Sequence, residues 1–299
     1  MTITNFEKLV DLLYRRGTRK RIAVVNGIDN HTQRAIEMAL DEGIADIIFV
    51  GGRDVISRNQ IWPHFTTHVS YVDAADPDDA ARRAVELIRE GNADILMKGK
   101  LNTDNLLRAV LDRDKGMLPK GNVLTQITLA DIPTFPRMLL FSDAAVIPFP
   151  TQEQRIAQVR YVVHAWHIMG VECPRVSLIH CSEKVDARHF PYTAGYADIK
   201  HMAERGDFGK CIVDGPLDLS TSCSPEALAV KGISSPLEGR ADALILPDIE
   251  TGNVLHKSLA LFARARTASV LQGALAPVVL PSRGDSIEGK FLSIALAAL

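Results

Sequence analysis

Two segments carry residue types that suit phosphate binding, and both follow an apolar run. In the first, Asp94–Thr103 (DILMKGKLNT), Lys98, Gly99 and Thr103 lie at a strand-to-helix passage. Backbone N–H groups at the start of a helix, with an ammonium nearby, favour phosphate. The alternative is an ordinary turn whose lysines are solvated, because such turns are common.

The second segment is Pro277–Asp285 (PVVLPSRGD), which also leads from an apolar run toward a helix. A guanidinium grips phosphate through two parallel hydrogen bonds, so Arg283 is a candidate phosphate ligand. The hydroxyl of Ser282 is a candidate hydrogen-bond donor. Asp285 has an alternative function as the N-cap of the last helix, with Glu288 at the capping-box position.

Carboxylates follow two further apolar runs. The segment Asp242–Asn253 (DALILPDIETGN) places Asp248 and Asn253 after one of them, and Lys257 lies one turn further on. The segment KCIVDGPL places Asp214 after the other. Such a carboxylate can orient a lysine or arginine, or it can cap a helix.

Composition restricts the class of partner. The chain has 299 residues, 46% of them hydrophobic, and a formal net charge of −2. That length suits two domains with a real core. The chain lacks the excess of basic residues that would indicate nucleic-acid binding. An anionic substrate must therefore be held by a local group of cations.

The termini and cysteines indicate a compartment. Charged residues interrupt the apolar residues of the N-terminal segment, so we expect no signal peptide, and no apolar run is long enough for a membrane span. The four cysteines, Cys173, Cys181, Cys211 and Cys223, lack CxxC spacing. A reduced cytoplasmic protein fits these features best.

Apolar, β-branched runs alternate with amphipathic helical runs along the chain. We expect strands at 21–27, 46–51, 69–73, 94–99, 175–181, 210–214, 242–247, 268–273 and 277–281, a further apolar run at 137–146, and helices at 31–43, from 76, at 103–115, from 151, from 224, at 250–266 and at 286–299. Thr151 and Gln154 form a capping box. This order predicts an α/β protein with parallel sheets covered by helices, in which polar residues just after strands are the site candidates.

At these segments the chain resembles the phosphate acetyl/butyryltransferase family. The resemblance is collinear from about Val24 to the C-terminus and is strongest at LMKGKLNTDNLLRAVLDRDKGM, FSDAAVIPFPTQEQRIAQV, VDGPLDLSTSCSPEALAVKGISSP, ADALILPDIETGNVLHKSLALFARA and PVVLPSRGDSIEGKFLSIALA. The MKG turn is more similar to the butyryl branch. The resemblance implies a two-lobed α/β fold like that of isocitrate and isopropylmalate dehydrogenases, with residues 1–148 plus 267–299 as the first domain and 149–266 as an inserted second one.

The reaction implied by the resemblance is acyl-CoA plus phosphate giving acyl phosphate plus CoA, by direct transfer in an interdomain cleft. It implies that Arg283 binds phosphate, that Ser282 stabilises the oxyanion, and that Glu288 and Asp285 are the neighbouring acids. The substrate-binding residues that it implies are Lys98, Gly99, Thr103, Arg108, Asp143, Thr151, Asp214, Asn253 and Lys257. It also implies a homodimer or larger homo-oligomer, acyl-CoA and phosphate as the only partners, and no metal or redox cofactor.

The chain departs from the family pattern at three places. Gly289 stands where the acetyl branch has a carboxylate proposed as base, Thr125-Gln126 replaces a common serine-histidine, and Ile147 replaces a common asparagine. These departures leave open a non-catalytic regulatory relative that binds acyl-CoA or phosphate. A dehydrogenase of similar fold is a further alternative, although the sequence shows no nicotinamide motif or metal-binding aspartate set.

Overall fold

The computed structural model describes residues 2–54, 57, 65–282 and 284–299. This part of the chain divides into two compact units. Unit 1 comprises residues 2–5 and Thr125–Arg266, and unit 2 comprises Phe6–Leu124 and Thr267–Leu299. The break at 124–125 differs from the one expected at 148–149, because residues 125–148 form two strands that pair with each other and with a later strand of unit 1.

Unit 2 holds a mostly parallel sheet with strands in the order β3-β2-β1-β4-β11-β10. Strand β11 runs parallel to β4 but antiparallel to β10, and the other neighbouring pairs are parallel. The strands are β1 (Lys20–Val25), β2 (Ala45–Gly51), β3 (Val69–Asp73), β4 (Ile95–Lys98), β10 (Arg266–Gln272) and β11 (Val278–Val279). The carboxyl ends of β1, β4 and β11 therefore meet at one edge of the sheet.

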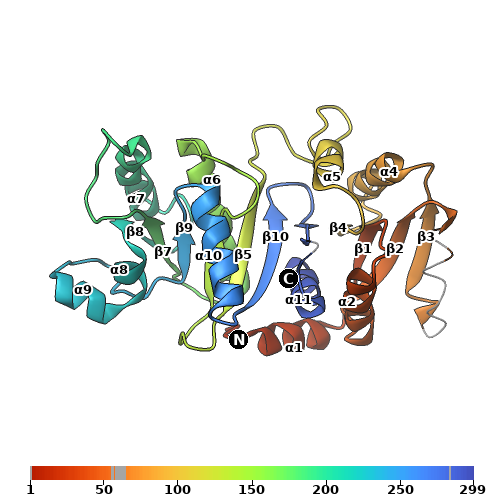
Figure 1. Cartoon of the computed structure of the whole chain (residues 1–299), viewed down its shortest axis with the longest axis horizontal. Helices are drawn as coiled ribbons and strands as arrows, with labels where there is room; N and C mark the ends of the chain where they lie inside the picture. Colours follow the sequence, from red (N-terminus) through yellow and green to blue (C-terminus); the bar gives the residue numbers. More distant parts are fainter. Residues whose placement is uncertain (1, 55–56, 58–64, 283) are drawn as a thin grey trace. The chain divides into compact units, whose positions relative to one another are not determined.

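Helices cover both faces of this sheet. Figure 1 shows α4 (Pro77–Arg89) and α5 (Thr103–Val110) on one side and α1 (Phe6–Arg16), α2 (Asn30–Asp41) and α11 (Ile287–Ala297) on the other. Aspartates start two of these helices, since Asp29 accepts the Thr32 N–H and Asp76 accepts the Asp79 N–H. The start of α4 at Asp76-Pro77 is the one predicted from the sequence.

Unit 1 holds the strand order β5-β6-β9-β7-β8. Strands β5 and β6 are antiparallel, whereas β6, β9, β7 and β8 run parallel to their neighbours. The strands are β5 (Thr125–Asp131), β6 (Leu139–Ser142), β7 (Arg175–Ile179), β8 (Ile212–Leu217) and β9 (Ala243–Ile245). The fold class is thus mixed α/β, with antiparallel pairs in both units beside the parallel pairs that the sequence predicts.

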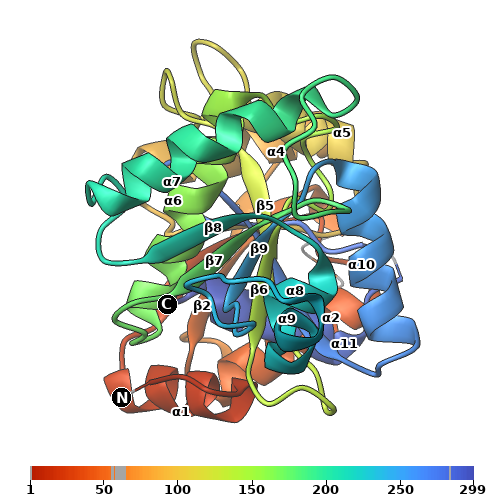
Figure 2. The same ribbon diagram turned by 90° about the vertical axis from the view of Figure 1, so that its left-hand side faces the viewer.

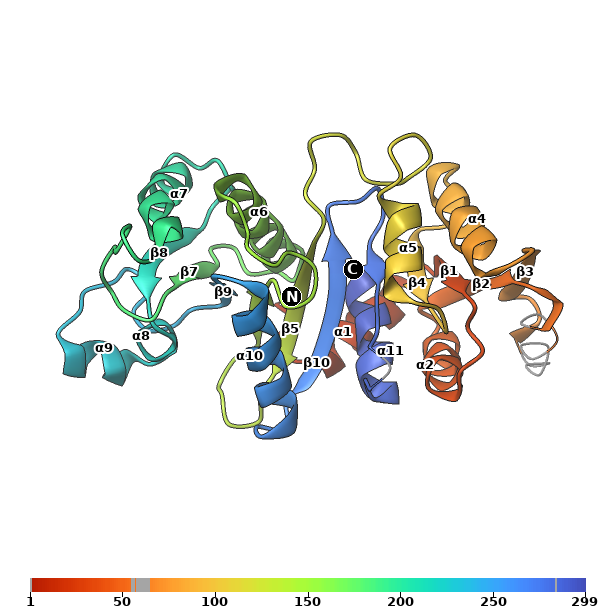
Figure 3. The ribbon, with the colours of Figure 1, turned by 45° about the horizontal axis from the view of Figure 1, so that its top comes forward.

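The helices of unit 1 also lie on both sides of its sheet. In Figure 2 and Figure 3, α6 (Gln152–Ile168) and α7 (Tyr196–Glu204) lie on one side and α8 (Leu219–Cys223), α9 (Pro225–Lys231) and α10 (Ile249–Leu261) on the other. A short 3₁₀ turn, Pro191–Gly195, precedes α7. The capping box predicted at Thr151 and Gln154 is confirmed, since Thr151 accepts the Gln154 N–H and Gln154 Oε1 accepts the Thr151 N–H at 2.8 Å.

Two predicted helices end earlier than expected. The helix at 103–115 ends at Val110, because the Asp112 carboxylate accepts the N–H groups of Asp114 and Lys115 and turns the chain. The helix at 250–266 ends at Leu261, because Arg264 takes a left-handed conformation with φ of 52° and Arg266 begins β10. No helix within the described ranges is long and apolar enough to cross a membrane.

Candidate active site

The Lys98–Gly99 turn at the end of β4 is packed tightly against the end of β1. Gly99 N–H donates to the Val25 carbonyl and Lys100 N–H to the Asn26 carbonyl, both at 2.8 Å. A Cβ on Gly99 would lie 2.5 Å from both carbonyl oxygens, so only glycine fits here. The side chain of Lys98 is 5% exposed and donates to the Leu101 carbonyl at 3.4 Å.

The loop after β11 is organised by Asp285. Its Oδ2 accepts the Ser282 N–H at 2.7 Å, and its own N–H donates to the Ser282 carbonyl at 3.2 Å. Asp285 is not the N-cap of α11, which is Ser286, whose Oγ accepts the Gly289 N–H at 3.0 Å. The capping-box alternative is therefore wrong for Asp285 and Glu288, because the third helical position is Gly289, which has no side chain.

These two loops share one cavity of about 310 Å³ in unit 2. It is lined by Asp29, Lys98, Gly99, Lys100, Leu101, Pro281 and Lys290. Sequence reasoning missed Asp29 and Lys290. Ser282 follows the lining residue Pro281 and is exposed, as is Glu288, whereas Arg283 lies outside the described residues.

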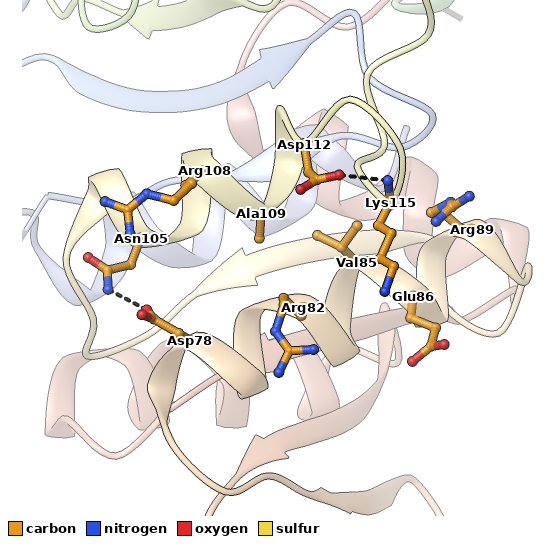
Figure 4. Close-up of a pocket in the computed structure, with 10 residues that line it drawn as sticks. All are labelled: Asp78, Arg82, Val85, Glu86, Arg89, Asn105, Arg108, Ala109, Asp112 and Lys115. Carbon is orange, nitrogen blue, oxygen red and sulfur yellow. Dashed lines mark hydrogen bonds between the residues drawn. The ribbon is translucent and has the colours of Figure 1, made fainter.

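Arg108 lines a different cavity of unit 2. This cavity, of about 460 Å³, lies between α4 and α5 and is lined by Asp78, Arg82, Val85, Glu86, Arg89, Asn105, Arg108, Ala109, Asp112 and Lys115 (Figure 4). Its cations outnumber its carboxylates, and Arg82 pairs with Asp79 at 2.8 Å. The cavity can hold an anionic group, but the structure does not bring Arg108 together with Lys98. Thr103, the exposed first residue of α5, lines neither cavity.

In unit 1, the Asp143 carboxylate is buried and fully engaged. The side chain is 1% exposed. Its oxygens accept hydrogen bonds from the Thr125 hydroxyl at 2.6 Å and from the backbone N–H groups of Gln126, Ala145, Val146 and Ile147. Asp143 therefore builds the loop after β6 and leaves no carboxylate oxygen directed to solvent.

Asp214 is likewise held inside unit 1. Its Oδ1 pairs with the Lys200 ammonium at 2.7 Å, its Oδ2 accepts the Ser235 hydroxyl at 2.7 Å, and the residue is 8% exposed. Of the two alternatives that the sequence left open for Asp214, orienting a lysine and capping a helix, the structure shows the first. Thr151 is the N-cap of α6, and its hydroxyl also donates to Glu153 at 2.9 Å.

Helix α10 carries Asn253 and Lys257, which lie one turn apart. The Asn253 amide donates to the Ala144 carbonyl at 3.3 Å. Its neighbour Gly252 packs directly on the loop after β6, since a Cβ there would lie 1.9 Å from the Asp143 carbonyl oxygen. Lys257 is exposed, and Asp248 accepts the Thr251 N–H as the N-cap of the helix.

A buried cation that the sequence analysis did not single out lies near the end of β9. Arg155 of α6 is 3% exposed and donates to the carbonyls of Leu246 and Pro247, and its guanidinium lies 4.8 Å from the centre of the Tyr192 ring. Burial lowers the pKa of this guanidinium. Only the packing of α6 reveals it, because an arginine in an amphipathic helix is usually solvated.

A family model described as phosphate acetyl/butaryl transferase matches residues 74–298. The chain belongs to this family. It is 39% identical over 295 residues to the phosphate acetyltransferase of Thermotoga maritima, covering 98% of each chain. It is 36% identical over 298 residues to the phosphate butyryltransferase of Clostridium beijerinckii, covering 99% of this chain and 97% of that protein.

Solved structures agree with the family assignment. A branched-chain phosphotransacylase from Enterococcus faecalis superposes with a TM-score of 0.81 at 29% identity, over 93% of this chain and 97% of that one. A phosphotransacetylase from Streptococcus pyogenes has the same fold, with a TM-score of 0.81 at 19% identity and 98% coverage of both chains.

The structure gives a physical setting for two departures from the family pattern. Thr125 is wholly buried and donates to Asp143, and the Gln158 amide donates to Thr125 at 3.3 Å. Ile147 is 6% exposed, and its N–H donates to Asp143. Both positions therefore belong to the same buried hydrogen-bond network. The departures from the family pattern at Thr125 and Ile147 are thus buried inside unit 1 and not exposed on its surface.

Proposed function

We propose that this member of the phosphate acetyl/butaryl transferase family interconverts short-chain acyl-CoA and phosphate with acyl phosphate and CoA. The observation that carries the proposal is the cavity of about 310 Å³ in unit 2. The Lys98–Gly99 turn and the loop after β11 line this cavity together. The near full-length similarity to named phosphate acetyl- and butyryltransferases supports it.

In the proposed reaction, a phosphate oxygen attacks the thioester carbon and forms a tetrahedral oxyanion, and the C–S bond then breaks. Ser282 is proposed to stabilise the oxyanion and Arg283 to bind phosphate. The CoA thiolate leaves and takes a proton. Glu288 and Asp285 are the two neighbouring candidates for proton transfer, and Asp285 also accepts the Ser282 N–H.

Substrate binding is proposed for both units. Lys98 and Gly99 would hold phosphate in the first cavity, and Arg108 in the second would hold an anionic part of CoA or phosphate. Thr103, which lines neither cavity, would bind substrate at the exposed start of α5. Asn253 and Lys257 would bind substrate from unit 1. For Asp143, Thr151 and Asp214 we propose positioning functions, because their polar atoms are engaged within unit 1.

The acyl-chain preference and the fold group are further proposals. We propose butyryl-CoA as the preferred substrate, supported by the MKG turn and by relatives named phosphate butyryltransferase. We also propose a two-lobed fold like that of the isocitrate dehydrogenase group. A 4-hydroxythreonine-4-phosphate dehydrogenase from Klebsiella pneumoniae, with a TM-score of 0.51 at 15% identity, is similar in fold.

We further propose that the enzyme acts in the cytoplasm as a homodimer or larger oligomer, without metal or redox cofactor and without nucleic-acid or membrane partners. The net charge of −2 supports the absence of a nucleic-acid partner. Exposed apolar side chains on and beside α10, namely Val254, Leu261 and Phe262, support an oligomer. Light scattering after size exclusion tests the oligomer, and a monomer at micromolar concentration would contradict it.

The test of the activity is consumption of acetyl-, propionyl-, butyryl- and valeryl-CoA with and without phosphate, with acyl phosphate trapped as the hydroxamate. We expect phosphate-dependent consumption, fastest with butyryl-CoA, and its loss in Arg283→Ala. If the folded protein consumes none of these thioesters, the transferase proposal fails. Tight CoA binding in that case would indicate a regulatory binder.

A further inference from the structure

Lys290 is a buried cation in a helix whose other residues are mostly apolar. It lies in the first turn of α11 (IEGKFLSIALA) and is 4% exposed. Its helix neighbours Phe291 and Leu292 are buried as well. Burying an ammonium is unfavourable unless it is paired or hydrogen-bonded, so its partners decide what it does.

The partners of Lys290 are too few for an ammonium. Its Nζ donates to the Ser282 carbonyl at 3.2 Å. No carboxylate of the described residues lies within ion-pair distance of it. An ammonium has three N–H donors, so donor capacity remains at the cavity that Lys290 lines.

The charge around this cavity favours an anion. Lys98 and Lys290 are both buried lining residues, and Lys100 is exposed at the rim. Among the residues that the structure describes, Asp29 is the one lining carboxylate, and its Oδ1 accepts the Thr32 N–H at 2.9 Å. A volume of about 310 Å³ accommodates a phosphate group.

We propose that Lys290 binds the phosphate substrate, by donating a charge-assisted hydrogen bond to a phosphoryl oxygen. This inference rests on the proposed function. The bond from Lys290 to the Ser282 carbonyl links this cation to the loop that carries Ser282, so phosphate binding also fixes that loop.

The test compares Lys290→Met and Lys290→Arg with the wild type. Methionine keeps much of the buried stem and removes the charge, whereas arginine keeps the charge. We expect Lys290→Met to raise the KM for phosphate about tenfold or more, with the KM for acyl-CoA nearly unchanged. Lys290→Arg should restore part of the phosphate affinity.

The matched control is Ser293→Ala on the same helix. The Ser293 hydroxyl donates to the Gly289 carbonyl and accepts the Ser269 N–H, away from the cavity lining. This variant should lower the melting temperature and leave the KM for phosphate unchanged. If Lys290→Met behaves like Ser293→Ala, Lys290 is only structural and the proposal is overturned.

A binding measurement separates this inference from the proposed function. Calorimetry with inorganic phosphate alone should show binding to the wild type and its loss in Lys290→Met, even if the protein shows no turnover. Should Lys290→Met fail to fold, carbamylation of wild-type Lys290 by cyanate decides. Phosphate should slow the carbamylation of Lys290. It should not slow the carbamylation of the control Lys210, which is exposed and paired with Glu172. Equal rates at Lys290 with and without phosphate would contradict the proposal.

Discussion

The Asp143 carboxylate is a structural acceptor, and its removal should be costly. Asp143→Ala removes the acceptor of four backbone N–H groups, those of Gln126, Ala145, Val146 and Ile147. Each unsatisfied buried donor costs about 1–3 kcal/mol, so we expect a loss of about 4 kcal/mol or more in the free energy of unfolding. Urea denaturation followed by circular dichroism measures it.

The comparison for Asp143→Ala is Asp248→Ala, which removes the N-cap of α10. That variant should cost about 1 kcal/mol. A small loss of stability in Asp143→Ala, together with a raised KM for a substrate, would instead support the substrate-binding role that the family resemblance implies.

At the scale of the single residue, the sequence predicted the two loops of the unit 2 cavity but not Lys290. Lys98 and Gly99 follow an apolar run directly, and so does Ser282, so their place at the carboxyl ends of parallel strands could be read from the pattern. A lysine one turn into a helix usually reaches solvent. Its burial depends on how α11 packs, which no local pattern specifies.

Among the elements, α6 provides a test of Thr151. Thr151→Ala removes the acceptor for the Gln154 N–H and should lower the free energy of unfolding by about 1 kcal/mol, whereas Thr151→Ser should be nearly neutral. Thermal melting of both variants measures this. A raised KM for acyl-CoA without loss of stability would show that Thr151 contacts substrate instead.

The start of β4 is tied to β1 by a pair that makes the stability of unit 2 depend on pH. The Arg21 guanidinium donates to both oxygens of Asp94, at 3.0 and 2.7 Å, and this hydrogen bonding holds the pKa of Asp94 below its usual range. The unfolded chain therefore takes up the proton at a higher pH than the folded chain. The stability from this pair is present above the ordinary aspartate pKa and is lost as pH falls through the lowered one.

We accordingly expect Asp94→Asn to reduce stability at pH 7 and to flatten the loss of stability below about pH 4. Urea midpoints at a series of pH values test this. The control is Asp11→Asn, whose exposed pair with Arg15 on α1 should contribute little. Parallel pH curves for Asp94→Asn and the wild type would refute the assignment.

Most elements could be predicted from apolar runs and capping residues, and the failures have physical causes. The strand at 69–73 and the start of α6 are as predicted. Strand β5 (TQITLAD) was missed because it is not an apolar run. Its polar residues Thr125, Gln126 and Thr128 are buried through hydrogen bonds that only the packed structure provides. The end of α10 was missed because no glycine or proline marks the left-handed Arg264.

For the whole molecule, the cysteines give a test of burial. Cys181 is exposed, whereas burial raises the pKa of Cys211 and of Cys223 to about 11. At pH 8 a thiol-reactive dye should label Cys181 rapidly, and the partly buried Cys211 and Cys223 much more slowly until the protein unfolds. Cys181→Ser should reduce the amplitude of the fast phase and Cys223→Ser should not. Fast labelling of Cys223 in the native protein would contradict its burial.

The position of β11 between β4 and β10 has a consequence for synthesis on the ribosome. Nearly all of unit 1 is encoded in one stretch, but the sheet of unit 2 awaits the strands that follow residue 266. Until Val278 and Val279 emerge, Leu96 and Met97 on the edge of β4 have no β11 partner. An open apolar edge is a site for wrong pairing. We therefore expect chains that end before that point to aggregate more readily than the full chain.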